Sequence, residues 1–164
     1  MVSVLWLVCA TLVVQVTLGC PNGWETFDGS CYFVSDIRED WPTASSTCGL
    51  YHAHLAEIES AREDTFLKQI ISKYHDGHSN DAEYWLGGAD IFVEGDWRWV
   101  YSDQLFSYTN WYPGEPNSYH NQQEDCLIVA IRQNREYRWD DRPCKEQNNF
   151  ICEIGDSSGA IVIG

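Results

Sequence analysis

Apolar side chains recur at helical spacing between residues 60 and 74, where positions three and four apart share one face of a helix. The residues of this stripe are Phe66, Leu67, Ile70 and Ile71. Ser60 and Glu63 precede it in the Ser-x-x-Glu order of a capping box, in which a hydroxyl and a carboxylate satisfy free backbone N–H groups. The pattern therefore predicts a helix from Ser60 to about Tyr74, with its apolar stripe in the core.

Another helix is predicted earlier in the chain, over residues 42–52. Pro42 suits the first turn of a helix, because its fixed φ is already helical and its missing N–H is not needed there. Asp40 lies near the expected cap, where a carboxylate accepts from the first N–H groups. This helix would carry Cys48.

From Tyr84 onward the pattern changes to short aromatic and β-branched runs separated by Gly, Pro, Asn and Asp. Such runs are typical of strands joined by long loops. Residues 127–131 are predicted to form a buried strand, and residues 150–153 another. Two helices ahead of an antiparallel sheet indicate the α+β class.

The first 19 residues contain no charged side chain, and Leu and Val dominate the stretch from Val2 to Leu18. The small-residue ending Thr17-Leu18-Gly19 suits signal peptidase, so residues 1–19 are predicted to be a signal peptide of a secreted protein. The alternative is a membrane anchor, for which about 17 residues is the short limit. No Lys or Arg flanks the segment to hold it in a membrane. Cleavage would leave about 145 residues, which suits one domain.

Cysteine number and charge narrow the classes further. Cys9 lies in the predicted signal peptide, and six cysteines remain: Cys20, Cys31, Cys48, Cys126, Cys144 and Cys152. An even number in a secreted chain indicates disulfides, although six cysteines allow fifteen pairings, and no close pair has zinc-finger spacing. The net charge of −15 lies wholly outside residues 1–19 and repels nucleic acids and anionic membranes, so we expect neither as a partner.

Three short clusters crowd acidic and amide oxygens into residues 115–141. They are Glu115-Pro116-Asn117, Glu124-Asp125-Cys126 and Trp139-Asp140-Asp141. Ca²⁺ takes oxygen ligands from carboxylates and carbonyls and tolerates irregular geometry, so loop residues scattered in sequence can supply them. A cis bond before Pro116 would turn the side chains on both sides of it toward one ion, and X-Pro bonds adopt cis most readily. The clusters predict a Ca²⁺ site.

In this order the clusters resemble those of the C-type lectin family, in which one Ca²⁺ also binds two sugar hydroxyls. The other matching runs are Gly23-Trp24, Cys31-Tyr32, His54-Leu55-Ala56, Trp85-Leu86-Gly87-Gly88, Trp97-Arg98-Trp99, Tyr108-Thr109-Asn110-Trp111 and Phe150-Ile151-Cys152-Glu153. The resemblance covers residues 20–154, implies the C-type lectin-like fold, and leaves residues 155–164 as a short unassigned tail. It also implies three disulfides: Cys20 with Cys31, Cys48 with Cys152, and Cys126 with Cys144.

By the same resemblance, five residues would hold the principal Ca²⁺: Glu115, Asn117, Glu124, Asp140 and Asp141. The sugar would contact the first four, and Glu before Asn in the loop implies mannose-type sugars. Asp140 stands where the family usually has Asn, so an amide donor is missing. The stretch 117–124 is one residue longer than in familiar mannose binders, which could displace Glu124. Both departures bear on sugar specificity more than on metal binding.

Some members of the family hold an auxiliary Ca²⁺ beside the first. Its ligands would be Asp90, Glu94, Glu124 and Asp125. The alternative is that residues 90–95 form a solvated acidic loop.

Three classes of function remain open. The site residues favour a secreted Ca²⁺-dependent lectin for mannose-type glycans on microbial or cell surfaces, acting in innate immune recognition or agglutination and gaining avidity by self-association. A structural protein that binds mineral or ice through the same fold is the alternative. An enzyme is not expected, because the sequence has neither a nucleophile-elbow motif nor His-Glu-x-x-His.

Overall fold

The structure is a computed structural model that describes residues 19–74, 82–117, 123–132 and 136–155. The predicted signal peptide up to residue 18 and the tail from residue 156 lie outside the described residues, so both remain predictions. None of the described helices is long and apolar enough to cross a membrane.

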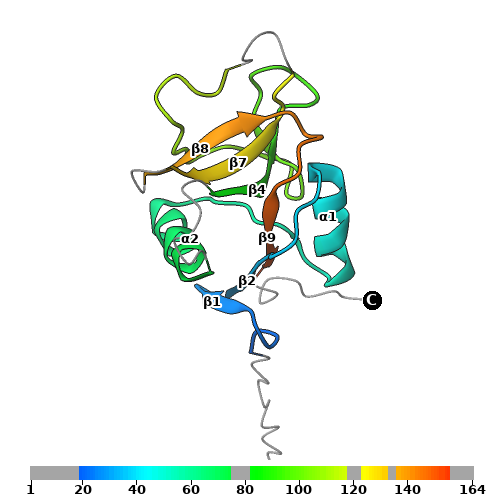
Figure 1. Cartoon of the computed structure of the whole chain (residues 1–164), viewed down its shortest axis with the longest axis vertical. Helices are drawn as coiled ribbons and strands as arrows, with labels where there is room; N and C mark the ends of the chain where they lie inside the picture. The colour runs from blue at the N-terminus through cyan, green and yellow to red at the C-terminus, as the bar shows by residue number, and fades with distance from the viewer. Residues whose placement is uncertain (1–18, 75–81, 118–122, 133–135, 156–164) are drawn as a thin grey trace, which may run out of the picture.

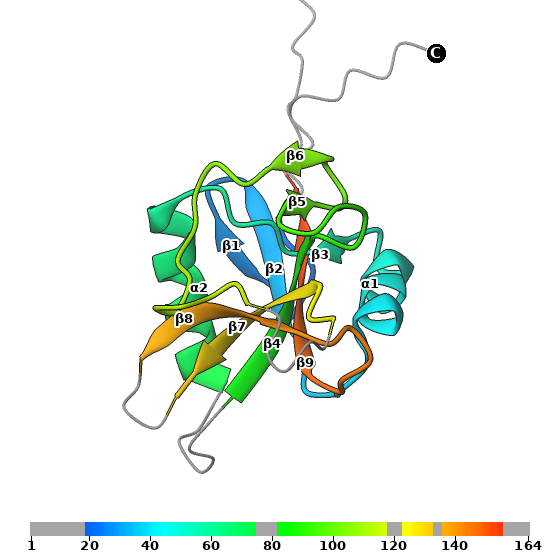
Figure 2. The ribbon, with the colours of Figure 1, turned by 90° about the horizontal axis from the view of Figure 1, so that it is seen from above.

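The chain folds into two helices and a set of short strands, which confirms the α+β class. In chain order the elements are β1 (Glu25–Phe27), β2 (Ser30–Val34), α1 (Trp41–Leu50), β3 (His54–Leu55), α2 (Ala61–Tyr74), β4 (Ala82–Ala89), β5 (Arg98–Trp99), β6 (Gln104–Leu105), β7 (Cys126–Ile131), β8 (Tyr137–Arg142) and β9 (Asn149–Ile154). The two predicted strands correspond to β7 and β9, each extended by one residue at its start and β9 by one at its end. The two helices flank the central strands on opposite sides (Figures 1 and 2).

Helix α1 is shifted toward the N-terminus relative to the predicted range 42–52. It begins at Trp41 because the Asp40 carboxylate accepts from the N–H of Thr43 at 2.8 Å, which places the cap at Asp40 itself. It ends at Leu50 because the N–H of the following residue turns back to the Cys48 carbonyl, and His52 adopts a positive φ of 56°. The prediction that the helix extends to His52 is therefore wrong.

Helix α2 confirms the predicted stripe, since Leu67, Ile70 and Ile71 are all buried. Ser60 is the cap, and its hydroxyl accepts from the N–H of Glu63 at 3.2 Å. The Glu63 carboxylate does not return to Ser60, however, but accepts from the N–H of Glu59 at 2.9 Å. The capping box is therefore formed in one direction only.

Strand β9 joins the two halves of the sheet. Its early residues Asn149 and Phe150 pair in parallel with β4, and its later residues pair antiparallel with β2 and β3. On the far side of β4, the strands β7 and β8 follow as an antiparallel hairpin (Figure 2). The last strand, β9, therefore lies beside β2 near the start of the domain, and the β7–β8 hairpin lies at the other end of the molecule from β1 (Figure 1).

Trp139, fully buried in β8, anchors the segment that carries the predicted acidic pair. Its indole N–H donates to the buried Asp64 carboxylate of α2 at 2.9 Å. Its backbone N–H donates to the Asn110 carbonyl and its carbonyl accepts from the N–H of Tyr112, both at 2.8 Å. These bonds hold the loop after β6 against β8, so the residues that follow Tyr112 lie beside those that follow Trp139.

All three implied disulfides are present. The bond between Cys48 and Cys152 ties α1 to β9 across 104 residues, a separation for which the chain-entropy account predicts a stabilisation of about 4 to 5 kcal/mol. The bond between Cys126 and Cys144 ties the start of β7 to the segment after β8. Glu124 and Asp125 immediately precede this last bond, so it fixes one side of the predicted site.

Candidate functional site

Three carboxylates gather where the loop after β6 meets β8. One carboxylate oxygen from each of Glu115, Asp140 and Asp141 lies within 4.8 Å of the others, and both aspartates are buried. Asp140 and Asp141 follow the anchored Trp139 on β8, and the backbone N–H of Glu115 bonds the carbonyl of Tyr112 at 3.0 Å. The fold therefore brings together groups that lie 25 or more residues apart in the chain.

Asn117 completes the contact between the loop and the strand. Its backbone N–H donates to both carboxylate oxygens of Asp141, at 3.0 and 3.2 Å, and its side-chain amide donates to the Glu115 carboxylate. The peptide bond between Glu115 and Pro116 is cis. Four of the five residues predicted to hold the principal ion thus lie together.

Glu124 is the fifth predicted ligand, and it does not belong to the compact group of three carboxylates. Its negative charge nevertheless contributes to raising the pKa of Asp141, which places the two in electrostatic contact. The residues between Asn117 and Glu124, except for Gln123, lie outside the described residues. The structure therefore leaves the prediction of a displaced Glu124 untested.

Two carboxylates of this group, those of Asp141 and Glu115, lie where their negative charge is disfavoured. Burial, together with the negative charges of Glu115 and Glu124, raises the pKa of Asp141 to about 7. Burial and the charge of Asp140 also raise the pKa of Glu115. A divalent cation would relieve this repulsion, and hard carboxylate and amide oxygens are the ligands that Ca²⁺ prefers. The donor set of Glu115, Asn117, Asp140 and Asp141 fits Ca²⁺.

Asp140 has two partners that the sequence reasoning did not include. Its Oδ2 lies 2.8 Å from both Arg132 and Arg142, and both guanidinium groups also pair with Glu83, at 2.8 and 3.2 Å. Two positive and two negative charges therefore cancel in this network. Asp140 and Arg142 are two positions apart on one strand and share a face, so this contact was predictable once the strand had been recognised.

The residues predicted for an auxiliary ion lie near one another but form no compact group of ligand atoms among the described residues. Asp90 is buried, and its backbone N–H donates to the carbonyl of Asp125 at 3.1 Å. Its Oδ2 accepts from the N–H of Gly95 at 2.9 Å, whereas its Oδ1 is buried without a hydrogen-bond partner. Burial and then the charges of Glu94 and Asp125 raise the pKa of Asp90.

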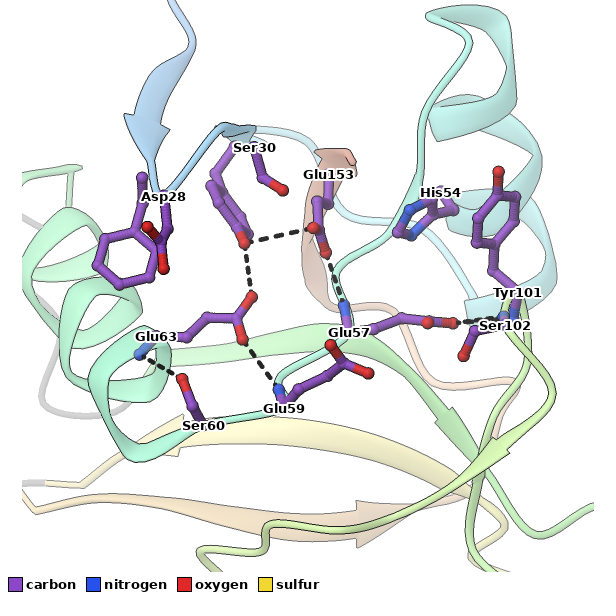
Figure 3. A pocket seen from close by; sticks show the side chains of 12 residues that line it. Asp28, Ser30, His54, Glu57, Glu59, Ser60, Glu63, Tyr101, Ser102 and Glu153 are labelled. Carbon is purple, nitrogen blue, oxygen red and sulfur yellow. Dashed lines mark hydrogen bonds between the residues drawn. The ribbon is translucent and has the colours of Figure 1, made fainter. Parts of the chain in front are cut away.

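Apart from this acidic site, the structure has a polar pocket of about 390 Å³ that was not predicted from the sequence (Figure 3). The buried carboxylates of Glu57, Glu63 and Glu153 line it, and the Tyr32 hydroxyl lies 2.5 Å from Glu63 and 3.3 Å from Glu153. Burial raises the pKa of Glu63 to about 7 and also raises that of Glu153. The sequence assigned Glu63 to a helix cap alone. None of the predicted metal or sugar ligands lines this pocket.

Two helices, short strands and three disulfides place the chain in the class of small disulfide-bonded α+β domains. Residues 37–154 match the family model of the lectin C-type domain. A perlucin-like protein of Mytilus galloprovincialis is 33% identical over 150 residues, which cover 91% of this chain and 92% of that protein. Perlucin of Haliotis laevigata is 34% identical over 135 residues, covering 82% and 83%. The chain belongs to the C-type lectin family.

Solved structures share the same fold. The carbohydrate-recognition domain of the mouse scavenger receptor C-type lectin is 29% identical, with a TM-score of 0.71, and covers 85% of this chain and 100% of its own. The C-type lectin domain of murine dendritic cell inhibitory receptor 2, solved with an N-glycan, is 29% identical with a TM-score of 0.71, covering 83% and 98%. A calcium-independent type II antifreeze protein is 26% identical with a TM-score of 0.69, covering 84% and 95%.

Proposed function

We propose that the protein is a secreted lectin that binds mannose-type glycans through a Ca²⁺ ion. The observation that carries this proposal is the contact between Glu115 and Asn117 in the loop and Asp140 and Asp141 on β8. A sugar hydroxyl beside a metal gives a lone pair to the ion, donates its proton to a carboxylate and accepts from an amide. Carboxylates and amides must therefore alternate around the ion.

Glu115 and Asn117 supply both kinds of group on one side of the proposed ion. The Glu115 carboxylate accepts from one sugar hydroxyl, and the Asn117 side chain offers a carbonyl to Ca²⁺ and an N–H to the sugar. The order of Glu before Asn is what the family resemblance links to mannose-type sugars. Asp140 and Glu124 would face the second hydroxyl, where two acceptors stand without an amide donor.

The relatives support a glycan ligand in general, without indicating which sugar. The domain of murine dendritic cell inhibitory receptor 2 was solved with an N-glycan, and its sequence is 29% identical to this chain. A single shallow site binds weakly, so useful avidity on microbial or cell surfaces requires several sites, and we propose self-association as their source. Innate immune recognition or agglutination follows as the role of such a lectin.

A glycan array run with Ca²⁺ and with EDTA tests the proposal. Wild-type protein should bind mannose-type glycans with Ca²⁺ alone. Replacing Glu115 with Gln and Asn117 with Asp should move binding toward galactose, by the family resemblance, while the distant substitution Glu59→Gln leaves it unchanged. Binding that persists unchanged in EDTA would contradict the proposal.

The second candidate is a surface-binding protein that uses the fold without sugar. It is favoured by the likeness to a calcium-independent antifreeze protein and by the net charge of −15. In that case the protein would bind no glycan on the array even with Ca²⁺, and adsorption to a mineral or ice surface would not depend on Glu115 or Asn117.

We also propose that Asp90, Glu94, Glu124 and Asp125 hold an auxiliary Ca²⁺. The supporting observation is that Oδ1 of Asp90 is buried without a hydrogen-bond partner.

A further inference from the structure

Arg142 reaches across the predicted ion site from the end of β8. Its Nη2 lies 2.8 Å from Oδ2 of Asp140, and its Nη1 donates to the backbone carbonyl of Asp141 at 2.8 Å. The same guanidinium lies 3.2 Å from Glu83, and the Arg142 side chain is only 21% exposed. A single planar cation therefore bridges two adjacent residues of the candidate site.

Both bridged oxygens belong to groups that the proposed Ca²⁺ would use. Asp140 contributes its carboxylate, and the family resemblance assigns Asp141 a backbone carbonyl ligand as well as its carboxylate. A guanidinium and a divalent ion repel each other and compete for the same lone pairs. Ca²⁺ can gain the Asp141 carbonyl only if Arg142 moves or shares it.

We propose that Arg142 is a built-in competitor of Ca²⁺ that sets the calcium affinity of the site, an inference that rests on the proposed function. The guanidinium neutralises Asp140 and occupies the Asp141 carbonyl, so the site binds Ca²⁺ more weakly than its number of carboxylates indicates. Arg142 would have to release or share the Asp141 carbonyl when Ca²⁺ binds, and its pairing with Glu83 would keep the side chain nearby.

Arg132 has a smaller part in this competition. It contacts Asp140 at 2.8 Å and Glu83 at 2.8 Å, and no bond to the Asp141 carbonyl is found for it among the described residues. It therefore neutralises the charge of Asp140 without covering a second ligand. The geometry orders the expected effects: removing Arg142 should matter more than removing Arg132.

Calcium titration calorimetry on four variants tests this order. Arg142→Gln should tighten Ca²⁺ binding by about tenfold or more, because a nearby positive charge and a competing donor are both removed. Arg132→Gln should tighten it by only a few fold. Arg142→Lys keeps the charge but cannot bridge two acceptors with a planar fork, so it should fall between wild type and Arg142→Gln.

Arg138→Gln is the matched control. Arg138 lies on the same strand and loses the same charge, but it pairs with Glu136 at 3.5 Å and bonds Asn110 at 2.7 Å, away from the acidic pair. Its Ca²⁺ affinity should stay within about twofold of wild type, since an exposed charge is well screened. Equal tightening in Arg138→Gln and Arg142→Gln would show a general charge effect and overturn the proposal.

Thermal unfolding is a second readout and, like the calcium titration, it requires no sugar. Thermal unfolding in EDTA should show Arg142→Gln less stable than wild type, because Glu83 and Asp140 lose a partner, and added Ca²⁺ should raise its Tm by more than it raises that of wild type. If Arg142→Gln folds and binds Ca²⁺ no better than wild type, the inference about Arg142 is wrong but the lectin proposal stands. If neither protein binds Ca²⁺, the inference about Arg142 and the lectin proposal both fail.

Discussion

The backbone N–H of Asn117 donates to both carboxylate oxygens of Asp141, at 3.0 and 3.2 Å. This contact fastens the Glu-Pro-Asn loop to β8 with a group that is itself a predicted calcium ligand. If Asp141 binds Ca²⁺ as proposed, loop position and ion binding would be coupled through one side chain.

Replacing Asp141 with Asn should weaken Ca²⁺ binding by at least about a hundredfold, because the ion loses a charged ligand and the loop loses a charge-assisted anchor. Sugar binding should fall with it at any fixed Ca²⁺ concentration. Calorimetry measures the first effect. Asp103→Asn, an exposed position outside the site, is the control and should bind Ca²⁺ as wild type does.

Calcium affinity should depend on pH near neutrality. The pKa of Asp141 is raised to about 7 and that of Glu115 is raised as well, so protons must leave these groups before Ca²⁺ binds. Affinity should therefore fall as the pH drops below about 7, and added Ca²⁺ should recover sugar binding. Calorimetry in buffers of different ionisation enthalpy should show proton release near pH 6.5, and binding without proton release would contradict the assignment.

Asp140→Asn should change stability and sugar affinity in opposite directions. The amide restores a donor to the sugar, so mannose affinity at saturating Ca²⁺ should rise, by up to about tenfold for one neutral hydrogen bond. The same change leaves Arg132 and Arg142 with Glu83 alone, so the free energy of unfolding should fall by roughly 1 to 2 kcal/mol, discounted for their partial exposure.

Denaturant unfolding and mannose titration of the same Asp140→Asn protein separate these effects. Adding Arg142→Gln to Asp140→Asn should recover most of the lost stability, because the surplus positive charge is removed. A weaker mannose affinity for Asp140→Asn at saturating Ca²⁺ would show that the donor argument is wrong.

Glu63→Gln should stabilise the fold at high pH. Burial raises the Glu63 pKa from 4.5 to about 7, so the folded state binds the proton more tightly than the unfolded state. The stabilising contribution is complete below pH 4.5 and is lost as the pH rises through about 7, a difference of roughly 1 to 3 kcal/mol. Gln removes this loss, because an amide does not ionise.

Unfolding in EDTA at pH 5 and pH 8 measures that change. The stability difference between the two pH values should shrink in Glu63→Gln and stay as in wild type in Asp28→Asn, which alters an exposed side chain that lines the same pocket. An unchanged pH dependence in Glu63→Gln would mean that Glu63 is ionised in the folded protein.

Short-range pattern was enough to predict α2 and the strands β7 and β9. The spacing of Leu67, Ile70 and Ile71 determines a buried face before any tertiary contact is known. The end of α1 was misplaced because it depends on the backbone of Tyr51 and His52, whose conformations leave no signature in residue type. The disulfide pairing could not be derived from spacing, and it came from the family resemblance.

The sequence predicted four residues that the fold brings together at the candidate site, but it did not predict their surroundings. Glu115, Asn117, Asp140 and Asp141 are recognisable because their motifs are contiguous in sequence. Glu83 and Asp140 share their arginine partners only through the register of β4, β7 and β8, which places Glu83 opposite Ala130 and Asp140 opposite Ile128. Long side chains that reach between strands follow from this register, and the register is a property of the folded sheet.

The pairing of β2 with β9 determines where the protein can be fused or immobilised. Cys31 lies opposite Ile154 in that ladder, so the described chain enters and leaves the fold at one end, while Asp140 and Asp141 lie on β8 toward the other (Figure 1). A tag, a tether to a sensor chip or a fused oligomerising segment can be joined at residue 19 or residue 155, the ends of the described chain, without covering the loop of Glu115. Several copies linked in this way would present their sites outward in the same direction, which is the arrangement that a multivalent glycan surface requires.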